Sequence, residues 1–126
     1  MAGRWQNWSG DLSCAPLRVE RPVDEAGVVD AVCRAAADGL VLRPVGSGHS
    51  FTPLCVTDGV QLDLGGLSRL LDVSADGVAR VEAGMTLHRL SLALHAHGRA
   101  LENLGDIDKQ TVAGAVATAT HGTGAA

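Results

Sequence analysis

The sequence predicts a small domain of mixed helices and strands that begins with a strand–helix–strand unit. Residues 17–20 alternate between apolar and charged side chains, as a half-buried strand does. Residues 24–38 carry apolar side chains at helical spacing, and residues 40–45 form an apolar run that is typical of a strand. Because 126 residues can bury one core of their own, we expect a single βαβ-like domain portion over residues 1–126.

Capping residues predict the first helix and the segments on either side of it. Asp24 is a preferred N-cap residue, and Gly39 closes the segment as a residue after the C-cap. The face expected to pack inward carries Val29, Val32, Cys33 and Ala36. Residues 1–16 are polar and rich in turn formers, so we expect an extended arm whose tryptophans, Trp5 and Trp8, cover apolar surface.

A glycine-rich loop follows the strand at residues 40–45. Gly46, Ser47 and Gly48 are small and leave main-chain N–H groups uncovered, so an anion could approach closely. A glycine-rich turn is also an ordinary connection after a strand, and the loop alone leaves both interpretations open.

The remaining elements follow from alternation and capping. Residues 60–64 alternate and predict a strand with one buried face, and residues 70–81 predict a hairpin that turns at 74–77. Thr86 would cap a helix with Leu87, Leu90 and Leu94 on its buried face. Thr111 would cap a short helix in a run of small residues and direct its free N–H groups at an anion.

Composition excludes several functional classes. A net charge of −4 without a basic patch disfavours nucleic-acid binding, which depends on phosphate neutralisation. Three cysteines without metal-like spacing disfavour a zinc site or a disulfide framework, and His88 and His95 are two helical turns apart, too far for one ion. We therefore expect no metal and free thiols in a reducing, cytoplasmic location. No apolar run reaches the roughly 20 residues of a transmembrane segment, although peripheral membrane association stays open.

Two stretches together resemble a known family. One is Arg43-Pro44-Val45-Gly46-Ser47-Gly48-His49-Ser50-Phe51, followed by Thr57-Asp58-Gly59. The other is Asn103 to Asp108, followed by Thr111 to Gly114 and Thr118 to Gly124. In this order they resemble the sugar-1,4-lactone oxidases of the vanillyl-alcohol-oxidase flavoprotein superfamily, a group that includes gulonolactone, arabinonolactone and alditol oxidases. Asn7-Trp8-Ser9-Gly10 and Val81-Glu82-Ala83-Gly84 fit the same pattern.

The resemblance implies an α+β fold of the PCMH type (the p-cresol-methylhydroxylase type), in which two subdomains hold FAD between them. It also implies that residues 1–126 correspond to the N-terminal part of such a domain, with an incomplete second subdomain and without the substrate (cap) domain. The partners implied are FAD and a small sugar-lactone or polyol substrate. The residues that activate the substrate hydroxyl normally come from the cap, so no catalytic residue is named in this chain.

The resemblance also implies the cofactor-binding residues. His49 matches the histidine that the family joins covalently to the flavin, and a neutral imidazole is a suitable nucleophile near neutral pH. Asp106 would contact the ribose or use its main chain, and His121 would either face the flavin or order its loop. The implied FAD-binding set is Pro44, Val45, Gly46, Ser47, Gly48, His49, Ser50, Asp106, Thr111, Gly114, Thr118, Ala119, Thr120 and His121.

The function implied is that of a flavin-dependent oxidoreductase that passes a hydride from a CH–OH group to flavin, with dioxygen as acceptor. One alternative is a non-catalytic FAD-binding fragment. Another is a PCMH-type flavoprotein without the histidyl link, such as a cell-wall-precursor reductase, against which His49 and residues 105–108 argue. An unrelated nucleotide-phosphate binder is disfavoured because the loop lacks the G-K-[S/T] ending of a P-loop.

Overall fold

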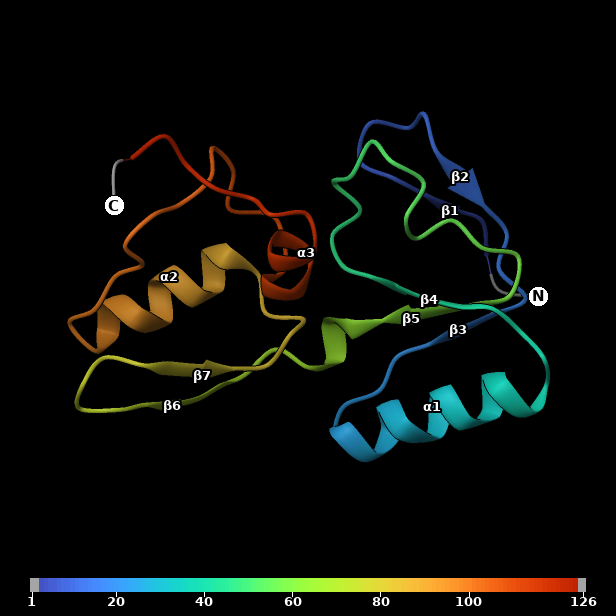
Figure 1. Cartoon of the computed structure of the whole chain (residues 1–126), viewed down its shortest axis with the longest axis horizontal. Helices are drawn as coiled ribbons and strands as arrows, with labels where there is room; N and C mark the ends of the chain where they lie inside the picture. The colour runs from blue at the N-terminus through green and yellow to red at the C-terminus, as the bar shows by residue number, and fades with distance from the viewer. Residues whose placement is uncertain (1–2, 125–126) are drawn as a thin grey trace.

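The computed structural model describes residues 3–124, which form two lobes side by side (Figure 1). The N-terminal lobe, residues 3–66, contains strands β1 to β5 and helix α1. The C-terminal lobe, residues 67–124, contains strands β6 and β7 and helices α2 and α3. Helix α3 lies where the C-terminal lobe faces the loop that follows β4.

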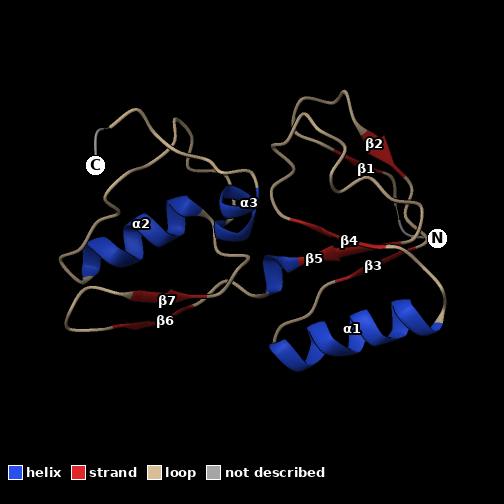
Figure 2. Cartoon of the chain, in the orientation of Figure 1, coloured by secondary structure: helices blue, strands red, loops and turns tan. Residues whose placement is uncertain are grey.

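The sheet of the N-terminal lobe is parallel and has the strand order β3-β5-β4. Its strands are β3 (Arg18–Glu20), β4 (Leu42–Val45) and β5 (Val60–Asp63). Because parallel strands need a long crossover, α1 (Glu25–Ala37) connects β3 to β4 and covers one face of the sheet (Figure 2). The predicted strand–helix–strand start is confirmed.

Helix α1 confirms the predicted caps but not the predicted packing face. The Asp24 carboxylate accepts a hydrogen bond from the Gly27 N–H at 2.8 Å, and Gly39 has a φ of +65°. The side chains buried on α1 are Ala31 and Ala35. The predicted inward residues Val29, Val32, Cys33 and Ala36 all lie on the exposed side. The chain carries two apolar stripes at helical spacing, and the sheet packs against the one with smaller side chains.

Strand β5 differs from its prediction because it is the central strand. Its side chains are buried on both faces of the sheet, where we expected one. Gln61 is only 1% exposed, and its amide Nε2 donates to the Cys55 carbonyl at 3.2 Å. The polar residue in this alternating pattern is therefore a buried amide with a hydrogen-bond partner, and it does not face solvent.

The expected N-terminal arm is a short hairpin. Strand β1 (Trp5–Gln6) pairs antiparallel with β2 (Ser13–Cys14). Asn7 is buried in the connecting turn, where its Oδ1 accepts hydrogen bonds from the N–H groups of Gly10 and Leu12. Trp8 is 66% exposed, so the expectation that it covers apolar surface is wrong.

The C-terminal lobe follows the predicted order closely. Strands β6 (Leu70–Val73) and β7 (Ala79–Val81) form the antiparallel hairpin, and helix α2 (Leu87–Ala96) packs on it. Thr86 caps α2, whose buried residues are Leu87, Leu90 and Leu94 as predicted. Thr111 caps the short helix α3 (Val112–Ala117). A 3-10 turn at Leu64–Gly66 leads from β5 into this lobe. Between residues 3 and 124 the structure has no helix with the length and apolar character that crossing a bilayer requires.

Candidate functional site

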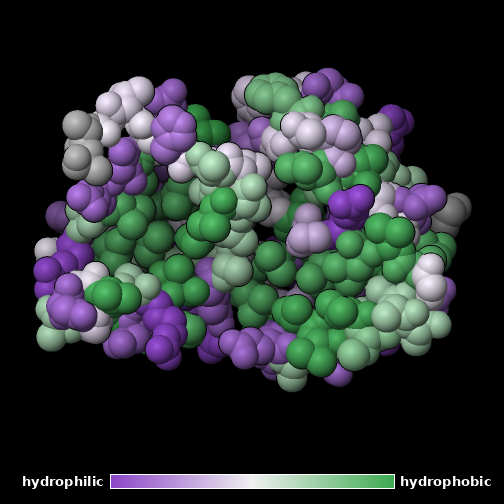
Figure 3. Space-filling model, in the orientation of Figure 1, coloured by the Kyte–Doolittle hydropathy of each residue, from purple (hydrophilic) through white to green (hydrophobic). Residues whose placement is uncertain are grey.

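A hollow of about 640 Å³ lies between the two lobes. Figure 3 shows the surface dipping between them. The whole predicted loop 44–50 lines it, together with Thr111, Gly114 and Thr118 from the C-terminal lobe. Strand β4 presents the loop from one side and α3 presents its small residues from the other. Further lining residues, which were not among the predicted cofactor-binding residues, are Leu42, Arg43, Phe51, Thr52, Leu54, Cys55, Gln110 and Ala117.

The loop after β4 contains a glycine at positive φ and several backbone N–H groups without a protein acceptor. Gly48 has a φ of +68°, and a Cβ at this position would lie 3.0 Å from the Trp5 ring, so glycine fits where other residues are strained. Within residues 3–124, the N–H groups of Ser47, Gly48, His49 and Ser50 donate to no protein acceptor. These four donors are therefore available to a ligand, as the sequence predicts.

The N-terminal hairpin holds this loop by its backbone. The Trp8 N–H donates to the Gly48 carbonyl at 2.9 Å, and the Asn7 side-chain amide donates to the Ser50 carbonyl at 3.2 Å. On the other side, the Ser47 hydroxyl donates to the Lys109 carbonyl of the C-terminal lobe. The loop is thus tied to both lobes through its carbonyl groups and one hydroxyl.

The two lobes are in direct contact at Gly46. A Cβ at this position would collide with Thr111 Oγ1, the atom that accepts the Gly114 N–H at 3.1 Å to cap α3. Glycine at 46 thus lets the N-terminus of α3 reach the loop and close one side of the hollow.

A double-mutant cycle at this contact would test the closure. We expect Gly46→Ala to destabilise the protein by about 1–3 kcal/mol, since Thr111 cannot withdraw without losing its cap. In the background of Thr111→Ala the same change should cost much less, because the colliding oxygen is gone. The free energies of unfolding of the two single variants and the double variant measure this coupling. If the losses in free energy of unfolding of the two single variants simply add in the double variant, the lobes are not in contact here.

Helix α3 does not offer free N–H groups to an anion, which corrects the prediction for its N-terminus. The N–H of Val112 donates to the Met85 carbonyl at 2.8 Å and that of Ala113 to the Ala83 carbonyl at 2.9 Å. The third N–H, from Gly114, is taken by the Thr111 cap. The helix contributes small side chains to the hollow, and its first donors are used to fasten it to the segment after β7.

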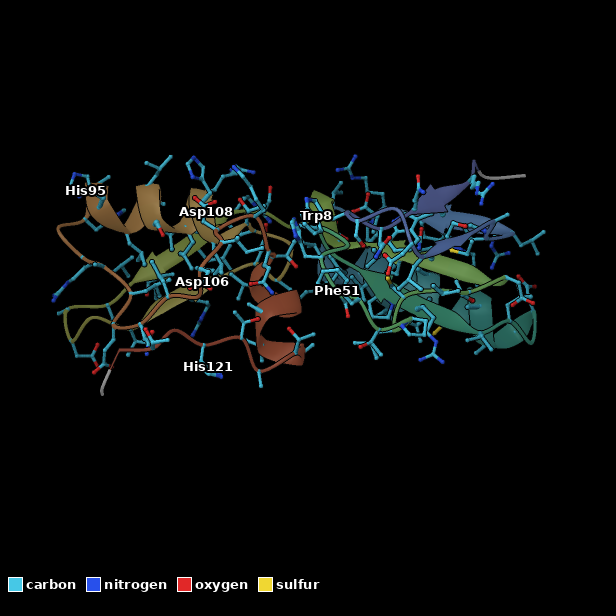
Figure 4. All side chains as sticks on the ribbon, turned by 90° about the horizontal axis from the view of Figure 1, so that it is seen from above. Trp8, Phe51, His95, Asp106, Asp108 and His121 are labelled. Carbon is cyan, nitrogen blue, oxygen red and sulfur yellow. The ribbon has the colours of Figure 1, made fainter. Side chains whose placement is uncertain are left out.

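An aromatic cluster surrounds the candidate histidine. The Trp8 indole stacks on the His49 imidazole with ring centroids 5.3 Å apart and planes 22° apart. Phe51 meets Trp8 edge to face at 6.2 Å. Figure 4 shows Trp8 and Phe51 on the side of the N-terminal lobe that faces the C-terminal lobe. Trp8 stands in the quoted Asn7–Gly10 motif, but nothing in the local sequence indicates that it contacts His49.

Four predicted residues lie outside the hollow. Asp106 and His121 are exposed in the C-terminal lobe (Figure 4), and His121 places Nδ1 3.0 Å from the carbonyl of its neighbour Gly122. Ala119 has a φ of +51°, and the Thr120 hydroxyl accepts the Gln110 amide at 2.8 Å. Since these residues are absent from the lining of the hollow, their contact with a cofactor stays a prediction.

Two ionisable groups, Asp108 and Cys55, have pKa values that their surroundings shift. The His88 ring nitrogen lies 2.6 Å from an Asp108 carboxylate oxygen, and this hydrogen bond lowers the pKa of Asp108. Burial raises the pKa of the Cys55 thiol, which therefore lines the hollow as a neutral thiol and not as a nucleophile near neutral pH. Among residues 3–124 there is no group of three or more side chains able to hold a metal ion.

Comparisons with known sequences agree on one family. Residues 16–126 match the family described as FAD binding domain. The chain is 48% identical over 125 residues to an L-gulono-1,4-lactone dehydrogenase of Mycobacterium tuberculosis, and 37% identical over 123 residues to a D-arabinono-1,4-lactone oxidase of Kluyveromyces lactis. These alignments cover 98% and 94% of this chain but only 29% and 23% of the two relatives. The chain therefore spans about a quarter of the length of the relatives it matches.

Solved structures agree on the fold. A cholesterol oxidase from B. sterolicum superposes with a TM-score of 0.82 at 26% identity, covering 94% of this chain and 24% of the oxidase. An alkyldihydroxyacetonephosphate synthase superposes with a TM-score of 0.75 at 22% identity, covering 82% of this chain and 21% of that protein. The predicted α+β fold of the PCMH type is confirmed.

Proposed function

Because the chain belongs to the FAD binding domain family, we propose that residues 1–126 contribute the flavin-binding loop of an FAD-dependent oxidoreductase acting on CH–OH groups of sugar lactones or polyols. One observation carries the proposal. The whole 44–50 loop and the small residues of α3 line one hollow from opposite lobes. Both sequence relatives reported above are named as lactone dehydrogenases or oxidases, which supports the substrate class.

The residues of the hollow fit a flavin nucleotide. About 640 Å³ is within the range of cofactor pockets, and the loop N–H groups are free to donate to phosphate oxygens. Among the described residues that line the hollow, none is a carboxylate and Arg43 is cationic, so a diphosphate meets no like charge. We propose that Ser47, Gly48 and Ser50 hold the phosphate or flavin edge and that Gly114 and Thr118 border it.

When bound, the flavin supplies the hydride acceptor of the reaction, since the protein sets its environment and the cofactor carries the redox chemistry. We also propose that a His49 ring nitrogen is joined to the flavin 8-methyl carbon. Formation of this C–N bond breaks one methyl C–H bond and the imidazole N–H bond. The two protons and two electrons that are released reduce dioxygen to hydrogen peroxide. Such a bond would prevent loss of the cofactor and orient its ring.

The remaining predicted residues extend this proposal into the C-terminal lobe. Asp106, Ala119, Thr120 and His121 would border a part of FAD that reaches beyond the hollow described above. Thr120 is linked to the hollow through its hydrogen bond with Gln110, which itself lines it. The groups that activate the substrate hydroxyl are proposed to lie in the part of the relatives that this chain does not span.

The test is to express the complete coding sequence that contains this chain, titrate the purified protein with FAD, and add substrates without oxygen. L-gulono-1,4-lactone, D-arabinono-1,4-lactone and an alditol are expected to bleach the visible flavin absorbance, and air is expected to restore it. If an electron-accepting dye restores the flavin absorbance and air does not, the protein is a dehydrogenase and not an oxidase. Bound FAD that no lactone or polyol bleaches would favour a flavoprotein of another reaction.

A pair of glycine variants makes the binding test specific to the loop. Gly48→Ala and Gly98→Ala both place a side chain at positive φ, +68° and +66°, so their backbone strain is matched. Only Gly48 adjoins the hollow and the Trp5 ring, whereas a Cβ at Gly98 meets nothing within 4 Å. FAD affinity is expected to fall only in Gly48→Ala. Equal affinity in both variants would contradict the proposed role of the loop.

A further inference from the structure

The imidazole of His49 is held differently from those of His88, His97 and His121. His88, His97 and His121 each place a ring nitrogen within hydrogen-bond distance of a carboxylate or carbonyl oxygen. Within residues 3–124, His49 makes no such hydrogen bond, and its ring contact is the stack with Trp8. A hydrogen bond usually orients an imidazole by occupying one ring nitrogen. Stacking holds the ring by its face and leaves both nitrogens free.

Trp8 is itself fixed relative to the histidine loop. Its backbone N–H donates to the Gly48 carbonyl, directly before His49 in the chain. The preceding residue, Asn7, donates to the Ser50 carbonyl directly after His49. The edge-to-face contact with Phe51 limits rotation of the indole from another side. The hydrogen bonds between the β1–β2 turn and the loop after β4 thus fix the backbone positions of Trp8 and His49 relative to each other.

We propose that Trp8 is a positioning residue for His49, a role that rests on the proposed flavin attachment described above. The indole restricts rotation of the imidazole about χ2 and keeps a ring nitrogen free to form the C–N bond. Trp8 and Phe51 are 66% and 67% exposed, so the cluster contributes little to the core. We infer that this exposed tryptophan, whose backbone N–H is bonded to the histidine loop, is placed beside the half-buried His49 to orient it and not to add stability.

The experiment measures the rate at which added FAD becomes acid-stable in the complete protein prepared without flavin. Wild type is compared with Trp8→Ala, Trp8→Phe and the control Val29→Ala, which shortens an exposed apolar side chain on α1. At saturating FAD, Trp8→Ala is expected to slow attachment roughly threefold to tenfold, the factor that loss of one aromatic stack implies. Trp8→Phe should recover most of the rate. The dissociation constant for FAD, measured before attachment, should change in none of them.

A second readout examines the stack without flavin. The Trp8 indole and the His49 imidazole are in direct contact, so replacing the imidazole should change the indole emission of the flavin-free protein. His49→Gln is expected to change the tryptophan emission relative to wild type, and this change should be absent when His49→Gln is made in the Trp8→Phe background. Thermal unfolding should show that each variant remains folded.

Each outcome separates this inference from the proposed function. Attachment at the wild-type rate in Trp8→Ala, while His49 still bears the flavin, overturns the positioning role alone. Weaker FAD binding with an unchanged rate at saturation also overturns it, because Trp8 would then be a binding residue. FAD that binds but never becomes acid-stable overturns both the inference and the covalent link, whereas the proposal of FAD binding stands.

Discussion

Alanine in place of His49 is expected to leave the protein without acid-stable flavin while reversible FAD binding persists. His49 lines the hollow beside the loop N–H groups, and neither ring nitrogen is engaged by the residues described. The loop is held by the carbonyls of Gly48 and Ser50, which the substitution leaves in place. The substitution therefore removes the covalent bond and leaves the conformation of the loop unchanged.

The measurement is flavin absorbance in the acid-precipitated protein, with the supernatant reporting reversibly bound FAD. His95→Ala is the matched control, because His95 is exposed at the end of α2 far from the cluster (Figure 4). A yellow precipitate is expected from wild type and His95→Ala, and a colourless one from His49→Ala. A yellow precipitate from His49→Ala would place the link at another residue.

The largest loss of stability is expected from Gly84→Ala. Gly84 is buried just after β7, and its N–H donates to the Leu67 carbonyl at 2.8 Å. A Cβ at this position would run into the Leu64 carbonyl and approach the Leu67 carbonyl. Both obstacles are backbone atoms at the 3-10 turn between the lobes, so no side-chain rotation relieves the collision. We expect a loss of about 3 kcal/mol or more in the free energy of unfolding.

Denaturant unfolding of the complete protein measures this loss, with Gly3→Ala as control. Gly3 has open space where its Cβ would lie, so its replacement should change the free energy of unfolding by less than about 0.5 kcal/mol. If Gly84→Ala lowered the free energy of unfolding no more than the control does, the segment after β7 would not pack closely against the 3-10 turn.

Prediction from sequence worked best where the physical cause lies within a few residues. Asp24, Thr86 and Thr111 each cap the helix they were expected to cap, because the side chain reaches a backbone N–H only three residues ahead. Gly39 ends α1 at positive φ for an equally local reason. The loop 44–50 and residues 111, 114 and 118 were found through ordered motifs, and the structure brings them to one hollow.

Prediction failed where the outcome depends on which surface packs against which. Helix α1 has two apolar stripes, and the choice of Ala31 and Ala35 over Val29 and Val32 depends on how closely the sheet approaches. Gln61 follows the alternation of a solvent-facing residue, yet pairing of β5 on both sides buries it. The N–H groups of α3 were expected to be free because their acceptors, Met85 and Ala83, lie far away in the sequence.

The sequence by itself determined the helix boundaries, the loop after β4 and, through ordered motifs, the flavoprotein family. These depend on local backbone preferences and on residues that stand together in the chain. Only the tertiary structure decided that Gly46 meets Thr111, that the first donors of α3 are already used, and that Trp8 stacks on His49. Each of these contacts joins segments distant in sequence, and packing energies between such segments leave no periodic or local pattern in the chain.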